Sequence, residues 1–302
     1  MKQLFPFRSA EARDLYHAWY HERADGWPIP TESRLVETAH GQTFVRVSGP
    51  PAAPPLVLLP GARASSLMWA PNIVAFAAQQ RTYALDLITD FGLSVCRAPL
   101  SRPEQLVAWL DELLAALVCD DRPALLGASY GGWLASRYAL AYPQRLRALV
   151  LIAPAATILP FAPSFFLHML PTLLPHRRLQ QRALHWLFED TLRSGAAGRE
   201  QLEVALDDLM LAGRCFHPRH IPKLIGPDVL SAADWGRLDV PTLVLLGEHE
   251  KIYDPVRAIR RLHTVAPQVQ VNQIAGAGHD LTTLRADAVC EQVLAFLNAT
   301  GR

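Results

Sequence analysis

Ser129 lies between two glycines, in the stretch Gly127-Ala128-Ser129-Tyr130-Gly131. A short apolar run precedes this stretch, and a helical run follows it. A serine on a sharp turn from strand to helix is held in a strained conformation with its Oγ exposed, and flanking glycines avoid clashes with both elements. The pattern therefore predicts a nucleophile, with the backbone N–H of Tyr130 facing a developing oxyanion. The alternative is a glycine-rich turn whose serine only caps the helix.

His279 follows the last predicted strand, in a loop that contains Gly276 and Gly278. These glycines allow a tight loop that could bring the imidazole over the serine. We predict that His279 takes the proton of Ser129 and later returns it to the leaving group. For most of the eleven histidines the simpler interpretation is a solvated side chain.

The acid that would orient the imidazole is predicted in the loop after the strand at residues 242–246. This loop offers three carboxylates, on Glu248, Glu250 and Asp254. A triad acid must reach the Nδ1–H of the histidine from such a loop. We favour Glu250, with Asp254 as the fallback, because Asp254 directly precedes a proline and has the pattern of a helix N-cap. For each carboxylate the alternative is a surface acid or a helix cap.

A second oxyanion donor is predicted in the loop after the first buried parallel strand. Gly61 lets the backbone turn so that the N–H of Ala62 points inward, although an ordinary Pro-Gly turn would have the same sequence. Trp69 and Trp133 are predicted to lie near the pocket. They are candidates for substrate binding, with packing as the alternative.

Continuous apolar runs alternate with helical patterns along much of the chain. Strands are predicted at residues 43–47, 56–59, 83–85, 124–126, 149–152, 242–246 and 269–274. Strands that are apolar throughout are buried on both faces, so the chain is expected to form an α/β fold with a mostly parallel sheet between two layers of helices. An amphipathic helix at residues 9–24 opens the chain.

The alternation of strands and helices stops between Ala155 and Trp235. Helical patterns occur there at residues 180–192 and 200–212, without a strong strand. We therefore predict a helical cap at residues 155–235, over the carboxyl edge of the sheet where open α/β sheets bind ligands. The core is then formed by residues 1–154 and 236–302.

The composition narrows the function classes. The chain has 302 residues, 50% of them hydrophobic, and a net charge of +1, which suits one large core with an insertion and argues against a nucleic-acid partner. The four cysteines, Cys96, Cys119, Cys215 and Cys290, are far apart. We interpret them as buried thiols in a reducing compartment, with no metal site and no disulfide.

Two further features bear on location. The N-terminus lacks the apolar region of a secretory signal, which predicts a cytoplasmic protein. The longest uncharged stretch, residues 148–174, is interrupted by four prolines, so no stable membrane span is expected. A homodimer is left open.

At these motifs the chain resembles the α/β-hydrolase superfamily, and most of all its capped esterase-type members. The resemblance runs from the Pro-Gly-Ala loop to the final Gly-His and includes Ser65-Ser66-Leu67-Met68-Trp69 and Pro71-Asn72-Ile73. It implies an eight-stranded, mostly parallel sheet and a Ser–His–acid triad that needs no cofactor. Carried over by position, it implies the nucleophile Ser129, the base His279, and the oxyanion donors Ala62 and Tyr130.

The chain departs from the superfamily pattern at two positions. The family usually has His-Gly where this chain has Pro60-Gly61, and it usually has aspartate where this chain has Glu250. Serine at the elbow argues against dehalogenase or epoxide-hydrolase chemistry, for which the family uses aspartate.

Several functions remain open at this point. The first is a serine hydrolase of small-molecule carboxylic esters or thioesters, with residues 158–174 forming a hydrophobic acyl pocket under a lid. The same triad would also suit an amidase, a lactonase or a C–C bond hydrolase. A non-catalytic ligand receptor or interaction protein of this fold is the alternative of another class, and a lipase acting at membranes is a further one.

Overall fold

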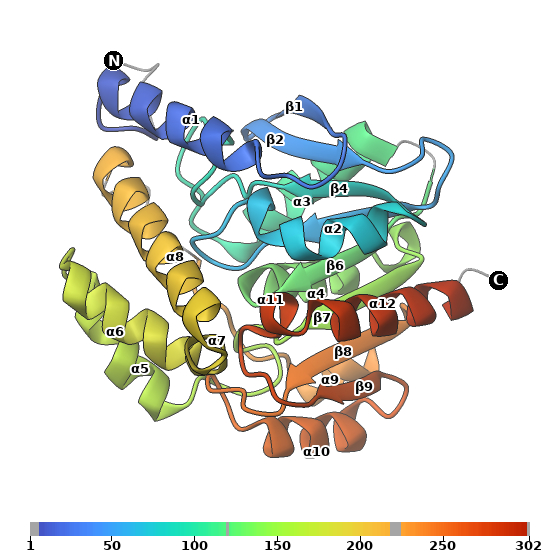
Figure 1. Ribbon diagram of the computed structural model, residues 1–302. Helices are drawn as coiled ribbons and strands as arrows, with labels where there is room; N and C mark the ends of the chain where they lie inside the picture. The colour runs from blue at the N-terminus through green and yellow to red at the C-terminus, as the bar shows by residue number, and fades with distance from the viewer. Residues whose placement is uncertain (1–5, 119–120, 218–224, 301–302) are drawn as a thin grey trace.

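The computed structural model describes residues 6–118, 121–217 and 225–300. Within these ranges nine strands form one sheet in the order β1-β2-β4-β3-β6-β7-β8-β9, with β5 paired to β2 (Figure 1). The neighbours from β4 to β9 pair in parallel, whereas β2 pairs antiparallel with β1, β4 and β5. The strands are β1 (Glu32–Thr38), β2 (Gly41–Ser48), β3 (Pro55–Leu59), β4 (Arg81–Leu85), β5 (Val95–Cys96), β6 (Ala124–Ala128), β7 (Ala148–Ile152), β8 (Thr242–Gly247) and β9 (Gln270–Ile274). The predicted α/β fold with a mostly parallel sheet is confirmed.

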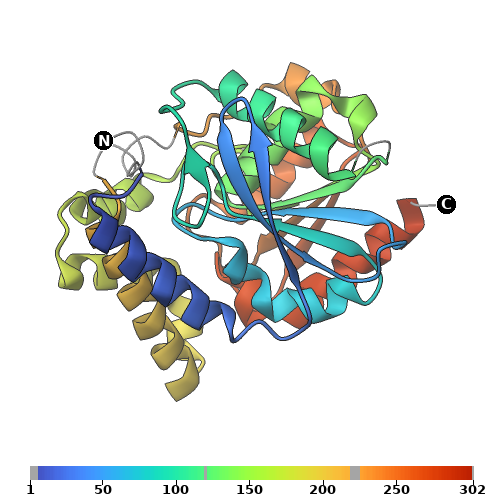
Figure 2. The same ribbon diagram turned by 90° about the horizontal axis from the view of Figure 1, so that it is seen from above.

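Helices cover both faces of the sheet, as Figure 2 shows from above. One face carries α3 (Pro103–Val118), α4 (Tyr130–Ala141), α9 (Ala232–Gly236) and α10 (Pro255–Val265); the other carries α2 (Ala70–Ala77), α11 (Leu281–Leu284) and α12 (Ala286–Thr300). Short 3₁₀ turns lie at η1 (Ser66–Trp69) and η2 (Pro143–Arg145). Successive residues of β3 enter opposite cores, Val57 and Leu59 on one side and Leu56 and Leu58 on the other. This double burial explains why the central strands are apolar throughout.

The sheet has one strand more than the eight that the family resemblance implied. Two strands carry no strong pattern of their own. Along β1 most residues are at least partly exposed, yet all seven pair with β2. The two residues of β5 pair with Gly41 and Gln42 at the start of β2. Pairing with β2, rather than an apolar pattern, therefore makes these segments strands.

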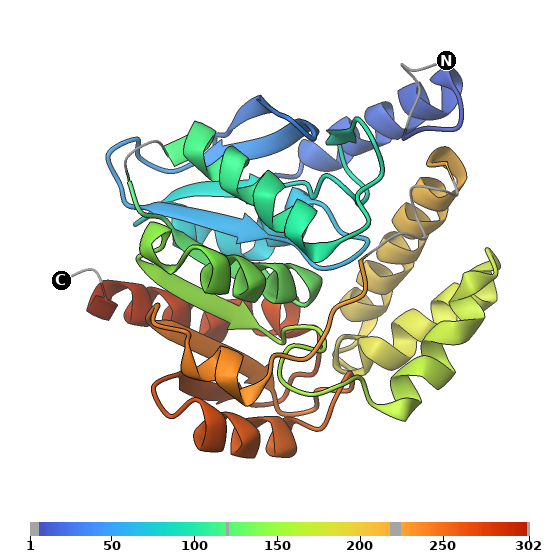
Figure 3. The same cartoon turned by 180° about the vertical axis from the view of Figure 1, so that it is seen from behind.

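A group of helices between β7 and β8 forms a layer beside the sheet (Figures 1 and 3). It contains α5 (Pro163–Met169), η3 (Leu170–Leu173), α6 (Arg177–Leu187), α7 (Glu189–Arg193) and α8 (Ala196–Cys215). The pattern at 180–192 predicted one helix, but the chain leaves helical geometry at Phe188, with φ −111° and ψ 44°, so that α6 and α7 are separate. We call these five elements the cap.

The predicted opening helix is α1 (Ala10–Ala24), and it packs against the cap helix α8 (Figure 2). Trp19 Nε1 donates to Asp208 Oδ1 at 2.9 Å, and Arg23 forms an ion pair with the same carboxylate at 3.0 Å. A β-bridge joins Phe7 to Phe216 just beyond α8. The predicted boundary at residue 154 places α1 in the core. In the structure α1 also packs against the cap.

The uncharged stretch at residues 148–174 forms β7, a loop and the short helices α5 and η3. Across the parts of the chain that the structure describes, none of the helices is both long enough and apolar enough to cross a bilayer.

Candidate active site

Ser129 lies at the sharp turn between β6 and α4. Its backbone has φ 50° and ψ −114°, a conformation that residues other than glycine rarely adopt. The turn is held by three backbone hydrogen bonds. Ser129 N donates to Ile152 O at 2.8 Å, and Ser129 O accepts from Trp133 N at 3.1 Å and from Ala155 N at 3.0 Å. Neighbouring strand and helix therefore hold the strained serine in place.

The glycines on either side are required by close approach of backbones. A Cβ on Gly127 would lie 2.2 Å from Gly131 O, and a Cβ on Gly131 would lie 2.4 Å from Leu59 O. These distances are far below van der Waals contact, so a side chain at either position would push β6, α4 or β3 apart. The glycines around Ser129 are thus required because side chains there would clash with the neighbouring strand and helix, as the sequence pattern predicted.

Three predicted side chains meet at this turn. His279 Nε2 lies 3.0 Å from Ser129 Oγ, and His279 Nδ1 lies 3.0 Å from Glu250 Oε2. The side chain of Glu250 is fully buried and that of His279 is 9% exposed. The order carboxylate, imidazole, hydroxyl is the arrangement in which an acid orients a base and the base takes a proton from a nucleophile.

Glu250 and Asp254 have different environments. Glu250 Oε1 accepts from Lys251 N at 2.7 Å and from Ile252 N at 3.0 Å, which fixes the carboxylate beneath the imidazole. Asp254 is exposed, and its side chain accepts from Arg257 N as the N-cap of α10. Glu248, the third carboxylate of this loop, accepts from Gly276 N at 2.8 Å. The structure therefore brings only Glu250, of these three acids, to the imidazole.

Burial and neighbouring charge act on His279 in opposite directions. Burial lowers its pKa, but the charge and hydrogen bond of Glu250, with a further contribution from the charge of Asp280, raise it by more. The net pKa is therefore higher than that of an exposed histidine. A raised pKa makes the imidazole a stronger base toward the Ser129 proton.

The predicted oxyanion donors lie on two segments that border Ser129, the start of α4 and the loop after β3. Tyr130 is the first residue of α4, where backbone N–H groups have no partner within the helix. A Cβ on Gly61 would lie 3.4 Å from Ser129 Cβ, so the loop that contains Ala62 passes directly beside the serine. Two N–H groups on these segments can therefore serve an oxyanion at the serine.

The loop that carries Ala62 is held by Asp90, which was not predicted to have a role at the site. The Asp90 carboxylate accepts the N–H of Arg63, whose φ is 60°, at 2.7 Å. Burial raises the pKa of Asp90 to about 7. Asp90 lies in the loop after β4, where Asp86 is the acid that directly follows the strand, so no sequence pattern pointed to Asp90.

The cap reaches the site through α7. Asp280 Oδ2 accepts from Thr191 N at 2.8 Å and from Thr191 Oγ1 at 2.5 Å. Lys251 forms an ion pair with Glu189, also on α7. The ring of Phe188 stacks near the His279 ring, with centroids 6.4 Å apart. The loops after β8 and β9 are thus both tied to the cap, and none of these contacts was predicted.

Trp69 and Trp133 are both completely buried. They lie in the cores on opposite faces of the sheet, and Trp133 Nε1 donates to Asp228 Oδ1 at 2.9 Å. Packing, the alternative noted for them, accounts for both positions.

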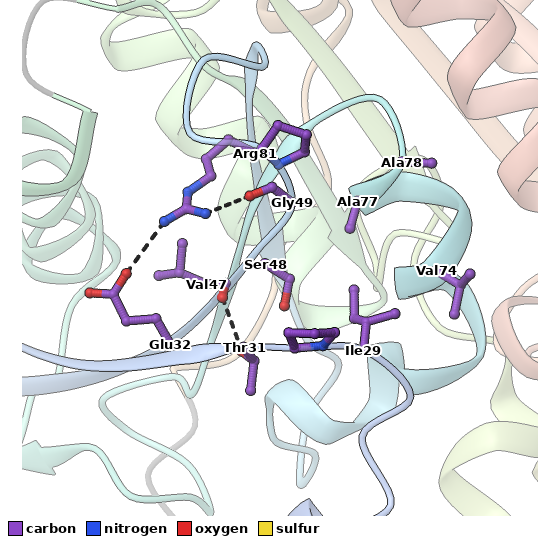
Figure 4. Close-up of a pocket in the computed structure, with 12 residues that line it drawn as sticks. Ile29, Thr31, Glu32, Val47, Ser48, Gly49, Val74, Ala77, Ala78 and Arg81 are labelled. Atoms are coloured by element: carbon purple, nitrogen blue, oxygen red, sulfur yellow. Dashed lines mark hydrogen bonds and ion pairs between the residues drawn. The ribbon is translucent and has the colours of Figure 1, made fainter.

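A groove of about 570 Å³ lies at the other end of the strands (Figure 4). It is lined by residues 29–32, 47–50, 74, 77, 78 and 81. Its arginine, Arg81, already pairs with Glu32 and donates to Gly49 O. The groove contains none of the side chains that meet at Ser129. Among the described residues no group of three or more His, Cys, Asp or Glu side chains has the arrangement of a metal site.

Comparison with known proteins gives a consistent result. The sequence profile described as the alpha/beta hydrolase family matches residues 56–292. The uncharacterized carboxylesterase nap of Bacillus subtilis is 33% identical over 293 residues, covering 94% of this chain and 92% of the relative. Carboxylesterase YbfK of the same organism is 30% identical and covers 96% of both chains. The crystal structure of naproxen esterase (carboxylesterase NP) from Bacillus subtilis superimposes with a TM-score of 0.85 at 31% identity, covering 96% of this chain and 99% of that one.

Proposed function

Because the chain belongs to the alpha/beta hydrolase family, we propose that it is a carboxylesterase of small to medium hydrophobic acyl groups, acting through an acyl-enzyme on Ser129. The observation that carries the proposal is the line of hydrogen bonds from Glu250 through His279 to Ser129 Oγ. Near full-length relatives that are named carboxylesterases support the same reaction.

The proposed reaction begins when Ser129 Oγ attacks the ester carbonyl carbon. His279 Nε2 takes the hydroxyl proton, and the carboxylate of Glu250 stabilises the imidazolium that forms. The N–H groups of Tyr130 and Ala62 stabilise the oxyanion of the tetrahedral intermediate. His279 then returns the proton to the leaving alkoxide or thiolate. A water molecule, activated by the same imidazole, releases the acid from Ser129.

The segment expected to form the acyl pocket is divided in the structure. Phe161 and Phe165 are half-buried and pack toward the core, with ring centroids 4.3 Å apart, whereas the leucines from 167 to 174 point to solvent. We assign the acyl-binding role to Phe161 and Phe165, because the backbone N–H of Ala162 donates to Ile252 O in the loop that carries Glu250. Apolar side chains at this position favour hydrophobic acyl groups over charged ones.

The first experiment measures hydrolysis of p-nitrophenyl acetate, butyrate and octanoate by the wild type and by Ser129→Ala. The variant is expected to lose at least about 10⁴-fold in kcat, because no other group can form the acyl-enzyme. The preference among chain lengths sizes the pocket, and matched amide and lactone substrates test the amidase and lactonase alternatives. If the wild type is inactive and a fluorophosphonate probe does not label Ser129, the esterase proposal fails and a receptor role replaces it.

We further propose that the protein works in the cytoplasm. Cys96, Cys215 and Cys290 are free, buried thiols, which suits a reducing compartment; Cys119 lies outside the described residues.

A further inference from the structure

One segment of the cap, formed by α5 and η3, exposes large apolar side chains. Among the described residues, half of the exposed large hydrophobic side chains fall between positions 166 and 174. They are Phe166, Leu167, Leu170, Leu173 and Leu174, with exposed fractions of 58%, 73%, 67%, 75% and 62%. We call these five residues the apolar stripe.

The spacing of the stripe is that of a helix. Phe166, Leu170, Leu173 and Leu174 follow the i, i+4, i+7 and i+8 pattern through α5 and η3, with Leu174 just past the end of η3, and Leu167 adjoins them. A surface helix in a protein surrounded by water turns such a face toward the core. Here the face turns outward, while Phe165 and Thr172 on the other side are partly buried. The apolar side of this segment therefore faces away from the core, which is the reverse of the usual arrangement.

The stripe is held in this orientation by the layer beneath it. Gln180 on α6 is 7% exposed, and its Nε2 donates to Thr172 O at 2.7 Å and to Leu174 O at 3.3 Å. Phe161 stacks on Phe165 from the inner side. Burying the leucines by rotating α5 and η3 would break these contacts, so the exposure is built into the cap.

The sequence segment that carries the stripe has basic but no acidic side chains. The sequence has no carboxylate between Asp121 and Glu189, whereas α6 begins Arg177-Arg178 and also carries Arg182. Arg177 pairs with Asp207 and Glu203 of α8. Arg178 and Arg182 are exposed, and no carboxylate in the described ranges lies within ion-pair distance of either. The helix α6 that carries these two arginines packs against both α5 and η3. An apolar face with unpaired cations on a neighbouring helix is complementary to an anionic lipid surface.

We propose that the apolar stripe inserts into the headgroup boundary of an anionic lipid surface and docks the cap there. A second copy of the chain fits the stripe less well, because a standard protein interface takes about 20–30 residues from each partner and the stripe has five. A bilayer needs only a narrow apolar face and a few cations to hold a protein peripherally. Docking of this kind goes beyond ester hydrolysis and does not depend on it.

The test is flotation of the full chain with vesicles of phosphatidylcholine, with and without phosphatidylglycerol. The wild type is expected to bind the vesicles that contain phosphatidylglycerol, and added salt is expected to weaken binding. The double variant Leu170→Glu, Leu173→Glu is expected to lose at least about tenfold in bound fraction. Arg178→Gln with Arg182→Gln is expected to lose severalfold on the same vesicles.

A matched control is available on the sheet. Leu35 of β1 is 60% exposed and lies outside the stripe, so Leu35→Glu is expected to bind vesicles like the wild type. Circular dichroism of each variant checks the fold, and flotation does not require turnover, so loss of esterase activity alone would leave this proposal standing. The proposal is overturned if the wild type does not float with either vesicle, or if Leu35→Glu binds as weakly as the double variant. Sedimentation velocity gives a further outcome that would overturn it. This outcome is a dimer that Leu173→Glu dissociates and that vesicles do not dissociate.

Discussion

The two sides of the hydrogen bond between Ser129 and His279 are held in different ways. The serine side, formed by β3, β6 and α4, is fixed by backbone groups that approach so closely that only glycine fits at Gly127 and Gly131. The histidine side, formed by residues 247–251 and 276–281, shares one such approach, since a Cβ on Gly247 would lie 2.3 Å from Gly278 O, but it is also fixed by side chains that reach the cap helix α7. Backbone constraints tolerate almost no substitution, whereas side-chain ties can be weakened one at a time. The comparison predicts abrupt losses of stability where backbones meet and graded losses where the histidine loops are tied to the cap.

The largest loss of stability is expected from Gly131→Ala. The new Cβ would lie 2.4 Å from Leu59 O, so β3 and α4 must separate, at a cost of about 2–4 kcal/mol in the free energy of unfolding. Urea denaturation measures this loss. The control is Gly213→Ala in α8, where no atom lies within 4 Å of the new Cβ and helix propensity favours alanine by up to about 1 kcal/mol. Equal destabilisation by both variants would contradict the steric account.

On the histidine side, Glu250→Gln is expected to cost about 10³–10⁴-fold in kcat, because the imidazolium loses its counter-charge. The charge of Glu250 also helps to raise the pKa of His279. The base must be neutral to act, so the wild-type rate falls as the pH drops below that raised pKa. Removing the carboxylate lowers the pKa, and the acid limb of kcat/KM should move to lower pH. An acid limb that stays in place would show that Glu250 does not set the pKa of this base.

A smaller, graded effect is expected from Thr191→Val, which removes one of two hydrogen bonds to Asp280 and leaves the Thr191 N–H in place. We expect a loss of about 1–2 kcal/mol in stability and about three- to tenfold in kcat, with little change in KM. Ser194→Ala is the control, because Ser194 Oγ donates to Thr191 O, in the same part of the cap. If the two variants have the same kcat, Thr191 has no role in positioning the histidine loop.

The smallest effect is expected from Asp254→Ala. This change removes the side-chain cap of α10 and should cost about 1 kcal/mol in stability, with activity within about twofold of the wild type. Thermal denaturation and the p-nitrophenyl butyrate assay measure both quantities. If Asp254→Ala lost as much activity as Glu250→Gln, Asp254 would be the better candidate for the acid that orients His279.

The same contrast explains what could be predicted from the sequence. The serine side depends on glycine spacing and on apolar runs, which are local, so the turn at Ser129 and the central strands were identified from the residues alone. Glu250 could be favoured because its rival Asp254 has the local pattern of a helix cap. The family was also indicated by these local motifs, and the comparisons confirm it.

The remaining features depend on contacts between distant residues. Thr191 and Asp280 are 89 residues apart, and a threonine in a helical segment carries no mark of its buried partner. The strand β1 exists because β2 pairs with it, since its own exposed residues lack an apolar alternation. The break at Phe188 separates α6 from α7, whose partners lie in the loops after β8 and β9, and a helical periodicity cannot show contacts of this kind.

The packing of α1 against α8 has a consequence for synthesis in the cell. Trp19 and its partner Asp208 are 189 residues apart, and the aromatic face formed by Tyr16 and Phe7 is completed by Phe216. At about 5–20 residues per second, α1 leaves the ribosome about 10–40 s before its partner helix exists. For that time the aromatic side of α1 that faces α8 lacks its partner. The nascent chain therefore exposes this side of α1 to chaperones, and slowing translation before α8 is made would lengthen its exposure to aggregation.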